Sequence, residues 1–444
     1  MAMQFFVKTS FCLERDFVRT ASKAIKRARF GLNYLMPYSR QTNMAVRGSN
    51  HSGMRQFNER IVLQAVRQNI AIPKADLARL TQLSTQTVAI IVDRLMADGL
   101  LIKNERIRGK IGQPSVPISL NPEGAFGVGV QVGRRGLELL VCNFVGEPIL
   151  TWKFLYDYPH PHTVLDKIKE GLAALEAQMG ERWAKVVGIG LASPLSLHQW
   201  ADVLSVPDAA SLAALAQWQH VNLRQVVQAL TPLPVEFAKD TTAACVAELL
   251  QGEGRGLSSY LYVFVGTFVG GGLVMAGHIV NGLRGNAGAI GSMPLGLASA
   301  QPSASMPAQL LQIASGWQLE QSLIAAHLDP LLVHDDSIMH ADYAAYTQPW
   351  LAQASGALAM LAASAAAMND IEAVVIDGSL GRSLINALIT DTQTALSQYR
   401  FDGMSAPALV RGQVGRQARA IGGAWLPLHA QFFPDKDVFL KQDA

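Results

Sequence analysis

The segment from residue 57 to residue 99 constrains the fold most, because its pattern is that of three short helices separated by a break and a tight turn. Apolar residues recur at helical spacing from Phe57 to Asn69. Pro73 stands where a second helix, Lys74 to Thr81, would begin. Ser84 then ends a short turn and is a favourable N-cap for a third helix, Thr85 to Asp98. This arrangement predicts a helix-turn-helix.

The apolar spacing also predicts which face of each helix is buried. We expect these faces to be Ile61, Val62, Ala65 and Val66 in the first helix, Leu77, Ala78 and Leu80 in the second, and Val88, Ile91, Val92 and Leu95 in the third.

A β-hairpin is predicted directly after the third helix. Leu100 to Lys103 and Ser115 to Leu120 have the pattern of two strands. The turn between them carries Arg106, Arg108 and Lys110. We therefore expect a wing whose basic tip contacts phosphate or the minor groove, and a winged helix-turn-helix (an α+β unit) over residues 55–122.

The start of the third helix has the composition of a DNA-reading surface. In a helix-turn-helix, the third helix enters the major groove with its N-terminal residues leading. These residues are all able to hydrogen-bond and none is acidic: Ser84, Thr85, Gln86 and Thr87. We predict that they contact bases and phosphates of double-stranded DNA; a plain helical bundle with capping Ser and Thr is the alternative.

The charge distribution favours the first interpretation. Residues 1–54 carry a net charge of +7, residues 55–122 carry +5, and residues 123–444 carry −9. A basic N-terminal part and an acidic remainder indicate that only the N-terminal part binds a polyanion. A basic surface that merely faces solvent would have the same charge. We expect residues 1–54 to be a disordered basic tail. It either adds phosphate contacts or precedes the true start of translation, at Met44 or Met54, and we favour the second interpretation.

The rest of the chain, residues 123–444, alternates strands and helices, which predicts an α/β domain of two lobes, each built on a mixed sheet. We place the small lobe at about 123–250 plus a C-terminal helix, and the large lobe at about 251–412. The Ala-rich run from Leu351 to Met368 is better explained by a buried helix than by a membrane span. Cys12, Cys142 and Cys245 lack metal-ligand spacing, which fits a reducing cytoplasm.

The chain resembles the ROK family, named for repressors, open reading frames and kinases. The strongest matches are the segment Ile72 to Leu101 and the block Phe264 to Pro294, which reads FVGTFVGGGLVMAGHIVNGLRGNAGAIGSMP. The resemblance covers roughly residues 57–430 and is specific to the transcription-regulator branch, since kinase members lack the N-terminal unit. It implies an actin-like ATPase fold, sugar-linked ligands and a homodimer or homotetramer.

Some family site residues carry over. Asp240 matches the catalytic base that contacts a sugar hydroxyl, although a carboxylate there could also cap a helix. Glu320 matches a sugar-contacting glutamate, with an exposed helix residue as the alternative. Together with Ser193, which follows the strand Val186 to Ala192, these residues form the predicted effector site.

Other positions depart from the family pattern. The resemblance implies a glutamate and a histidine where this chain has Ala289 and Ser292, and an asparagine where it has Lys239. No cysteine lies between residues 299 and 316, so the family's zinc site cannot form. The kinase phosphate turn, which opens with an aspartate, reads Gln131-Val-Gly-Arg-Arg135 here. The wing arginine of the family is replaced by Gln113.

These features predict a cytoplasmic transcriptional regulator, commonly a repressor, of carbohydrate-related genes. We expect an effector between the lobes, namely a sugar, a polyol or a sugar phosphate, and no catalytic residue, metal, cofactor or membrane association. One alternative is an ATP-dependent sugar kinase with an attached DNA-binding unit, which Asp240 and the glycine turn 266–272 favour and Gln131 and Arg134 oppose. Another is a regulator whose pocket no longer binds ordinary sugars, with Arg134, Arg135 or Lys239 holding an anionic group.

Overall fold

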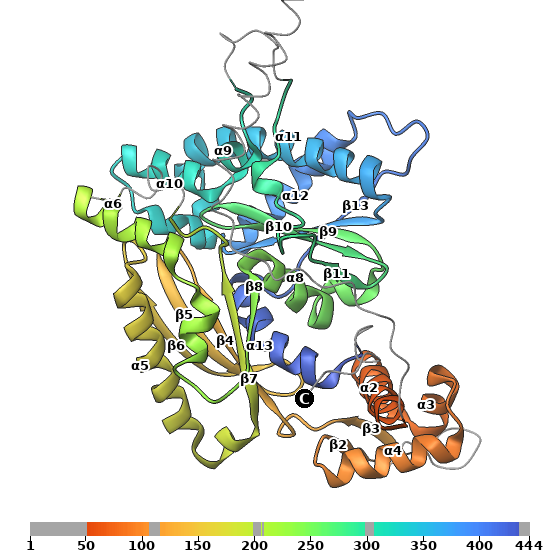
Figure 1. The fold of residues 1–444 in the computed structure, drawn as a ribbon. Coiled ribbons are helices and arrows are strands. Elements are labelled where there is room, and N and C mark those ends of the chain that lie inside the picture. Colours follow the sequence, from red (N-terminus) through yellow and green to blue (C-terminus); the bar gives the residue numbers. More distant parts are fainter. Residues whose placement is uncertain (1–50, 106–115, 199–205, 207, 298–305, 435–444) are drawn as a thin grey trace, which may run out of the picture. The chain divides into compact units, whose positions relative to one another are not determined.

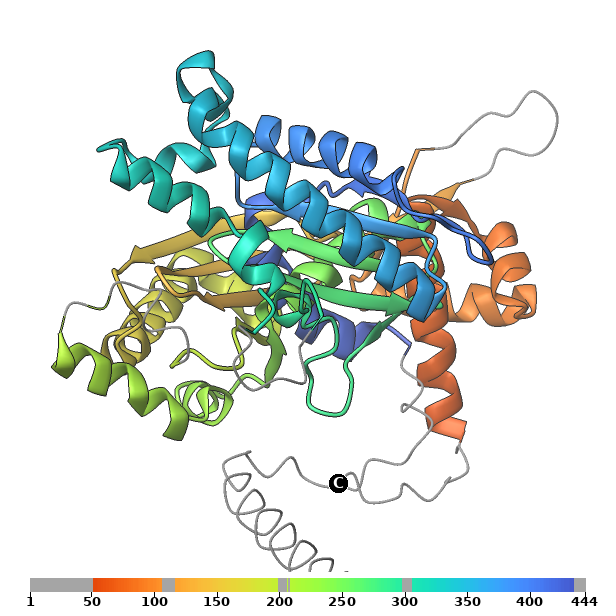
Figure 2. The ribbon, with the colours of Figure 1, turned by 90° about the horizontal axis from the view of Figure 1, so that it is seen from above.

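The computed structural model describes residues 51–105, 116–198, 206, 208–297 and 306–434, which are drawn as coloured ribbon in two views (Figures 1 and 2). Most of the predicted basic tail lies outside the described residues. So does the tip of the predicted wing, with Arg106, Arg108 and Lys110.

The first described residues form the predicted winged helix-turn-helix. Three helices alternate with a small antiparallel sheet whose strand order is β1-β3-β2. The first helix begins six residues before the predicted Phe57, whereas the other boundaries agree within two residues. The elements are α2 (His51–Asn69), β1 (Ile72–Pro73), α3 (Lys74–Thr81), α4 (Thr85–Ala97), β2 (Leu101–Lys103) and β3 (Pro117–Leu120).

The buried faces of these helices agree with the prediction at most positions. The four predicted residues of α4, from Val88 to Leu95, are all buried, and Leu77 of α3 is fully buried. Leu80 was predicted to be buried, but 54% of it is exposed. The helix α3 has only two turns and packs through Leu77; Leu80 lies about 60° further around the helix axis and misses that contact.

The remaining described residues form two lobes with the same sheet topology. Each sheet starts with an antiparallel three-stranded meander. Two further strands then run parallel to the meander's first strand and continue the sheet from it, which gives the orders β6-β5-β4-β7-β8 and β11-β10-β9-β12-β13. This confirms the predicted α/β fold with a mixed sheet in each lobe. The strands are β4 (Phe126–Val132), β5 (Gly136–Cys142), β6 (Pro148–Leu155), β7 (Val186–Ser193), β8 (Val235–Lys239), β9 (Tyr260–Val265), β10 (Val269–Met275), β11 (His278–Val280), β12 (Ala373–Gly378) and β13 (Ala408–Arg411).

Helices cover the sheets of both lobes (Figures 1 and 2). In the first lobe, α5 (Pro161–Met179) packs on β5 and β6, and α13 (Ala418–Phe432) packs on β4 and β7 from the other side. In the second lobe, α11 (Ala344–Asn369) packs against α12 (Arg382–Leu396) and against α9 (Leu310–Ala314). The helix α10 (Gly316–Ala325) contributes Leu319 and Leu323 to the same core.

The helix α8 (Asp240–Gln251) is fixed in place by backbone contact with α13. A Cβ atom at Gly422 of α13 would lie 1.7 Å from the carbonyl oxygen of Ala243 in α8. On its other side, α13 touches the sheet, where a Cβ at Gly129 would lie 1.9 Å from the carbonyl oxygen of Ala420. Only glycine permits such close approach. The sheet, α13 and α8 therefore form a tightly stacked unit that sets where α8 begins.

The long Ala-rich helix belongs to the second lobe's core. Among the described residues, the stretch Ala341–Asn369 is the one helix long and apolar enough to cross a membrane, judged by length and composition alone. Of its most apolar window, 61% is buried within the molecule. Its buried Ala and Leu residues pack within the second-lobe core, as expected for a core helix of this composition.

Candidate functional site

The start of α4 presents two exposed polar side chains to solvent. The Ser84 hydroxyl accepts a hydrogen bond from the Thr87 backbone NH at 3.1 Å and also lies 2.8 Å from the Thr87 hydroxyl. Ser84 is therefore the N-cap that the sequence predicts. Thr85 and Gln86 are exposed, and they are the members of the predicted reading set whose side chains are not engaged in the cap.

An exposed apolar residue extends this surface. Ile90 lies one helical turn after Gln86, and 55% of it is exposed. Residues four positions apart lie on one face of a helix. An isoleucine on this face could contact a thymine methyl group, so Ile90 belongs to the candidate reading surface. Ile90 was not among the residues predicted to contact DNA, although its spacing of four residues from Gln86 places it on the same face of the helix.

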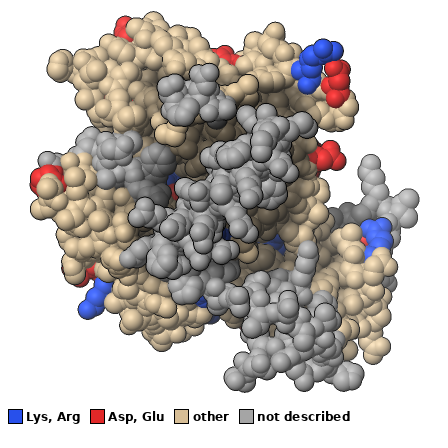
Figure 3. Space-filling view, turned by 45° about the horizontal axis from the view of Figure 1, so that its top comes forward, with Lys and Arg blue, Asp and Glu red and all other residues tan. Residues whose placement is uncertain are grey.

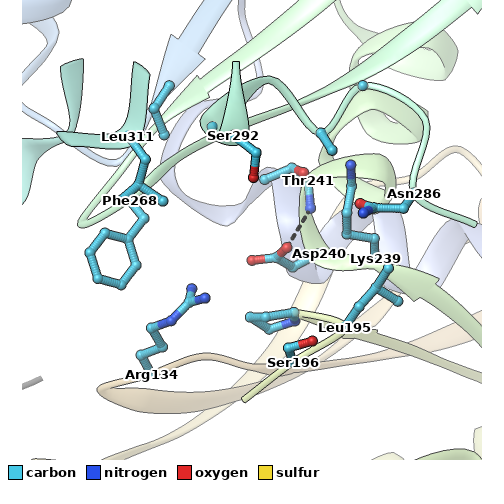
Figure 4. Close-up of a pocket in the computed structure, with 16 residues that line it drawn as sticks. Arg134, Leu195, Ser196, Lys239, Asp240, Thr241, Phe268, Asn286, Ser292 and Leu311 are labelled. Carbon is cyan, nitrogen blue, oxygen red and sulfur yellow. Dashed lines mark hydrogen bonds between the residues drawn. The ribbon is translucent and has the colours of Figure 1, made fainter. Parts of the chain in front are cut away.

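A small polar cavity lies where the two sheets face each other, next to the start of α8. Its volume is about 160 Å³, which suits a small metabolite better than a drug-sized ligand. Figure 4 shows its labelled lining residues. They come from the β4–β5 turn, the segment after β7, the β8–α8 junction, the β9–β10 hairpin, the loop between β11 and α9, and α9 itself. Among them are Arg134, Leu195, Ser196, Lys239, Asp240, Phe268, Asn286, Ala289, Ser292 and Leu311.

Asp240 is the acidic residue among those that line this cavity. It is the first residue of α8 and only 8% exposed, with one carboxylate oxygen accepting a hydrogen bond from the Thr241 NH at 2.9 Å. The other oxygen lies 3.7 Å from a guanidinium nitrogen of Arg419. The helix N-terminus and Arg419 both stabilise a carboxylate here. Asp240 thus lines the predicted pocket, and it also occupies the first turn of a helix.

Two cations flank Asp240 in Figure 4. Lys239 donates from Nζ to the carbonyl oxygen of Ala287 at 3.0 Å, and burial lowers its pKa to about 8 despite the attraction of Asp240. Arg134, from the β4–β5 turn, places its guanidinium 4.6 Å from the centre of the Phe268 ring. Burial lowers the pKa of Arg134 to about 10, an effect that Asp240 partly opposes. Two mostly buried cations therefore share the cavity with one carboxylate.

The predicted departures from the family pattern lie at this cavity. Ala289 precedes a short 3-10 turn (Ile290–Ser292) and Ser292 ends it, and both line the cavity. A methyl group and a short hydroxyl thus occupy positions where the resemblance implies a glutamate and a histidine. These two positions offer little hydrogen bonding to a sugar ring, whereas Asn286 of the same loop presents a side-chain amide to the cavity.

The other two predicted effector residues lie outside the lining set. Ser193 is 1% exposed, and its hydroxyl donates to the carbonyl oxygen of Pro194. Glu320 is 2% exposed and forms an ion pair with Arg135, with 2.5 Å between Nη1 and Oε2. The alternative of an exposed helix position is therefore wrong for Glu320. Its partner, 185 residues away in sequence, was not predictable from the spacing.

The glycines of the β9–β10 hairpin have a packing role. A Cβ at Gly270 would lie 2.8 Å from Cγ2 of Thr241, and one at Gly272 would lie 2.6 Å from Cβ of Cys245. Both neighbours are on α8. Close packing of the hairpin on α8 accounts for these two glycines.

The C-terminal end of α8 contacts the helix-turn-helix unit. Arg67 of α2 donates a hydrogen bond to the carbonyl oxygen of Leu250 at 2.6 Å, and its guanidinium lies 5.1 Å from the centre of the Phe433 ring. Arg255, just beyond α8, donates to the carbonyl oxygen of Gln68 at 3.0 Å. One helix therefore has the cavity at its first residue and the helix-turn-helix unit at its end.

The model of the ROK family matches residues 127–430. The chain belongs to the ROK family. This match covers both lobes and the cavity, and it confirms the family that the sequence resembles.

The xylose repressor of Caldicellulosiruptor bescii is 26% identical over 250 residues, which cover 54% of this chain and 59% of the repressor. That of Bacillus subtilis is 21% identical over 242 residues, or 54% of this chain and 61% of the repressor. This ROK chain thus spans about three fifths of the length of the curated relatives it matches.

A solved structure supports the fold over a longer part of the chain. The crystal structure of a ROK family transcriptional regulator, a homologue of the E. coli MLC protein, superposes with a TM-score of 0.61 at 18% identity. It covers 86% of this chain and 97% of that one. A ROK family glucokinase from Streptomyces griseus superposes with a TM-score of 0.51 at 18% identity, covering 68% of this chain and 99% of the kinase.

The site residues do not fit the Mg²⁺–nucleotide chemistry of the kinase branch. Gln131, which replaces the aspartate implied by the resemblance, is buried and carries no charge. Arg134 brings a cation into the same turn. No group of three or more His, Cys, Asp or Glu residues that could hold a metal ion occurs in the part of the chain that the structure describes. A carboxylate that positions Mg²⁺ is a recurring requirement of phosphoryl transfer.

Proposed function

We propose that this chain is a DNA-binding transcriptional repressor whose ROK domain binds a small carbohydrate-like effector and does not phosphorylate it. The observation that carries the proposal is that one chain holds both a helix-turn-helix and a cavity suited to a small ligand. Thr85 and Gln86 are exposed at the start of a helix-turn-helix reading helix, and a small polar cavity holds Asp240. The names of the matched repressors agree with this function.

The helix α8 offers a route from the effector to DNA. A ligand that contacts Asp240 acts on the first turn of α8, and the last turn of α8 holds Arg67 of the helix-turn-helix unit. A ligand changes the DNA affinity only if it binds the two conformations with different affinity. We infer that effector binding shifts α8 together with α13, and so changes the position of α2.

The chain acts as a homodimer or homotetramer in this proposal. Two reading helices then contact half-sites about one helical turn, or a multiple of it, apart on one pseudo-palindromic operator. Arg108 and Lys110, at the predicted tip of the wing, add contacts to phosphates in this proposal.

Selection of DNA from a random pool by the purified full-length protein tests this function. We expect an enriched pseudo-palindrome that the protein binds in gel shifts, and release of that DNA by a carbohydrate-class effector. Arg108→Ala with Lys110→Ala should weaken binding to all DNA and flatten its salt dependence. Failure to enrich any sequence would refute the regulator.

The kinase alternative has a direct assay. A coupled assay with MgATP across a panel of sugars should show no turnover, because Gln131 and Arg134 occupy the phosphate turn. Turnover that disappears in Asp240→Asn would overturn the proposal, since it would show Asp240 acting as a catalytic base.

A further inference from the structure

The charge of the cavity distinguishes it from a neutral sugar site. Arg134 and Lys239 line it together with one carboxylate, Asp240. Arg419 already lies against that carboxylate, with 3.7 Å between Nη1 and Oδ2. The cluster therefore has more cations than anions before any ligand enters.

Arg134 has no hydrogen-bond or ion-pair partner among the described residues, although Asp240 acts on it electrostatically. Its guanidinium stacks on Phe268, and its Nε has no hydrogen-bond partner although it is buried. A buried donor without a hydrogen-bond partner is unfavourable, and the planar set of guanidinium donors matches a carboxylate or a phosphate.

Lys239 adds positive charge on the other side of Asp240 (Figure 4). It uses one of its three donors on the carbonyl oxygen of Ala287, so two remain. On the face drawn in Figure 3, by contrast, charged side chains stand singly or beside one of opposite sign among the described residues, without a broad basic patch.

Two positions of the loop between β11 and α9 offer little to neutral hydroxyls, whereas Asn286 of the same loop keeps a side-chain amide at the cavity. Ala289 cannot hydrogen-bond through its side chain, and Ser292 has only a short hydroxyl. Asp240 remains able to accept a hydrogen bond from a ligand hydroxyl. The set of contacts therefore suits a molecule that carries both an anionic group and hydroxyl groups.

We propose that the effector is an anionic carbohydrate, whose carboxylate or phosphate lies against Arg134 while Lys239 adds positive charge and a ligand hydroxyl donates to Asp240. This inference rests on the proposed function of the ROK domain as an effector-binding domain. The carboxylate of a sugar acid and the phosphate of a sugar phosphate share the chemistry that Arg134 recognises.

Calorimetry on the full-length protein with matched ligands tests the proposal. The probes are glucose, glucuronate, glucose 6-phosphate and the corresponding xylose, xylonate and xylose 5-phosphate, with inorganic phosphate as the control for any small anion. We expect the acid or the phosphate to bind at least about tenfold more tightly than its neutral parent, since hydrogen bonds to a charged group are the stronger ones. Preference for the acid over the phosphate, or the reverse, identifies the anionic group.

Two variants locate the binding. Arg134→Gln and Lys239→Gln remove charge at similar size and should each weaken anion binding about tenfold or more, with little effect on any binding of the neutral parent. Arg400→Gln is the matched control, because Arg400 is exposed and forms an ion pair with the exposed Asp402 at the surface. Circular dichroism melting shows that each variant is folded.

Three results would overturn the proposal: neutral sugars that bind as tightly as their acids and phosphates, anion binding that Arg134→Gln leaves unchanged, or no response to any anionic probe. DNA binding is measured in parallel by fluorescence anisotropy. Selective DNA binding that a neutral sugar releases refutes the anionic effector and leaves the repressor standing. If the native protein shows no selective DNA binding at all, the repressor function itself is refuted.

Discussion

Arg135 and Glu320 join the two lobes of the ROK domain through an ion pair 2.5 Å long. Arg135 lies in the β4–β5 turn of the first lobe, and Glu320 lies on α10 of the second. The carboxylate is buried, whereas 38% of the arginine side chain is exposed. The pair therefore holds the turn that carries Arg134 against the second lobe, beside the cavity.

Removing the arginine should destabilise the fold more than removing the charge of the glutamate. Arg135→Gln leaves a buried carboxylate unpaired, and we expect a loss of about 1–2 kcal/mol in the free energy of unfolding, less than for a fully buried pair because Arg135 is partly exposed. Glu320→Gln leaves no buried charge and should lose less. Urea denaturation of both variants and of the double variant measures the difference.

The same variants decide between two roles of Glu320. If Glu320 only joins the lobes, Glu320→Gln changes stability and leaves effector affinity close to that of the native protein. A loss of effector affinity at unchanged stability would instead support the sugar contact that the family resemblance implies.

Two exposed residues at the start of α4 should control operator selectivity. Thr85→Ala with Gln86→Ala removes side chains that hydrogen-bond to bases, and each good base contact contributes about 1–3 kcal/mol of discrimination. We expect gel shifts to show similar binding to random DNA and reduced preference for the operator. Ser84→Ala is the comparison: loss of the N-cap should lower the free energy of unfolding by about 1 kcal/mol and weaken binding to every DNA. Unchanged selectivity in the double variant would show that another element reads the bases.

Ile90 should set a preference for thymine at one position of each half-site. Its exposed side chain lies one turn after Gln86, where apolar contact with a thymine methyl group is possible. We expect selection with Ile90→Ser to lose information at that single position, with other positions unchanged. Ala89→Ser, at a neighbouring site on α4, is the control. An identical selected sequence for Ile90→Ser and the native protein would exclude this contact.

Arg67 should couple the effector to DNA binding. It joins α2 to the end of α8 and lies over Phe433, and its burial lowers its pKa to about 10. In Arg67→Met, we expect operator DNA to bind but to be released much less by the effector, because α2 no longer follows α8. Titration of the effector against the protein–DNA complex measures this, with Arg55→Met as the control on the exposed part of α2. A normal release curve for Arg67→Met would place the coupling elsewhere.

The sequence predicts most of the fold because local patterns carry it. Helical spacing located α3 and α4 within two residues, and a serine at the turn marked the N-cap of α4. The alternation of strands and helices after residue 122 predicted the α/β class and the mixed sheets, but not the short third strand of the second meander, β11. Leu80 escaped this reasoning, because burial in a two-turn helix depends on what packs against it.

The candidate site was only partly predictable for the same reason. Asp240 and Lys239 are adjacent in sequence and meet at the cavity. Phe268 stacks on Arg134, and Glu320 pairs with Arg135, across well over a hundred residues. Such pairs form because the two sheets face each other in the folded chain. The spacing of residues along the sequence does not predict them. The effector class therefore became arguable only when the folded chain showed which cations share the cavity.

Lys239 should make effector binding depend on pH. Its pKa in the free protein is about 8, below the usual value for lysine, because burial disfavours the charged form. A bound anion favours the charged form and raises this pKa, so binding takes up a proton above pH 8. The affinity should therefore be constant at pH 7 to 7.5 and fall as the pH rises through 8 toward 9.5. Calorimetry with glucuronate, whose carboxylate does not titrate in this range, isolates the effect. In Lys239→Gln the affinity for glucuronate should be lower at pH 7 and should not fall further as the pH rises. If the affinity of the native protein stays constant up to pH 9.5, the bound anion does not interact with the charge of Lys239.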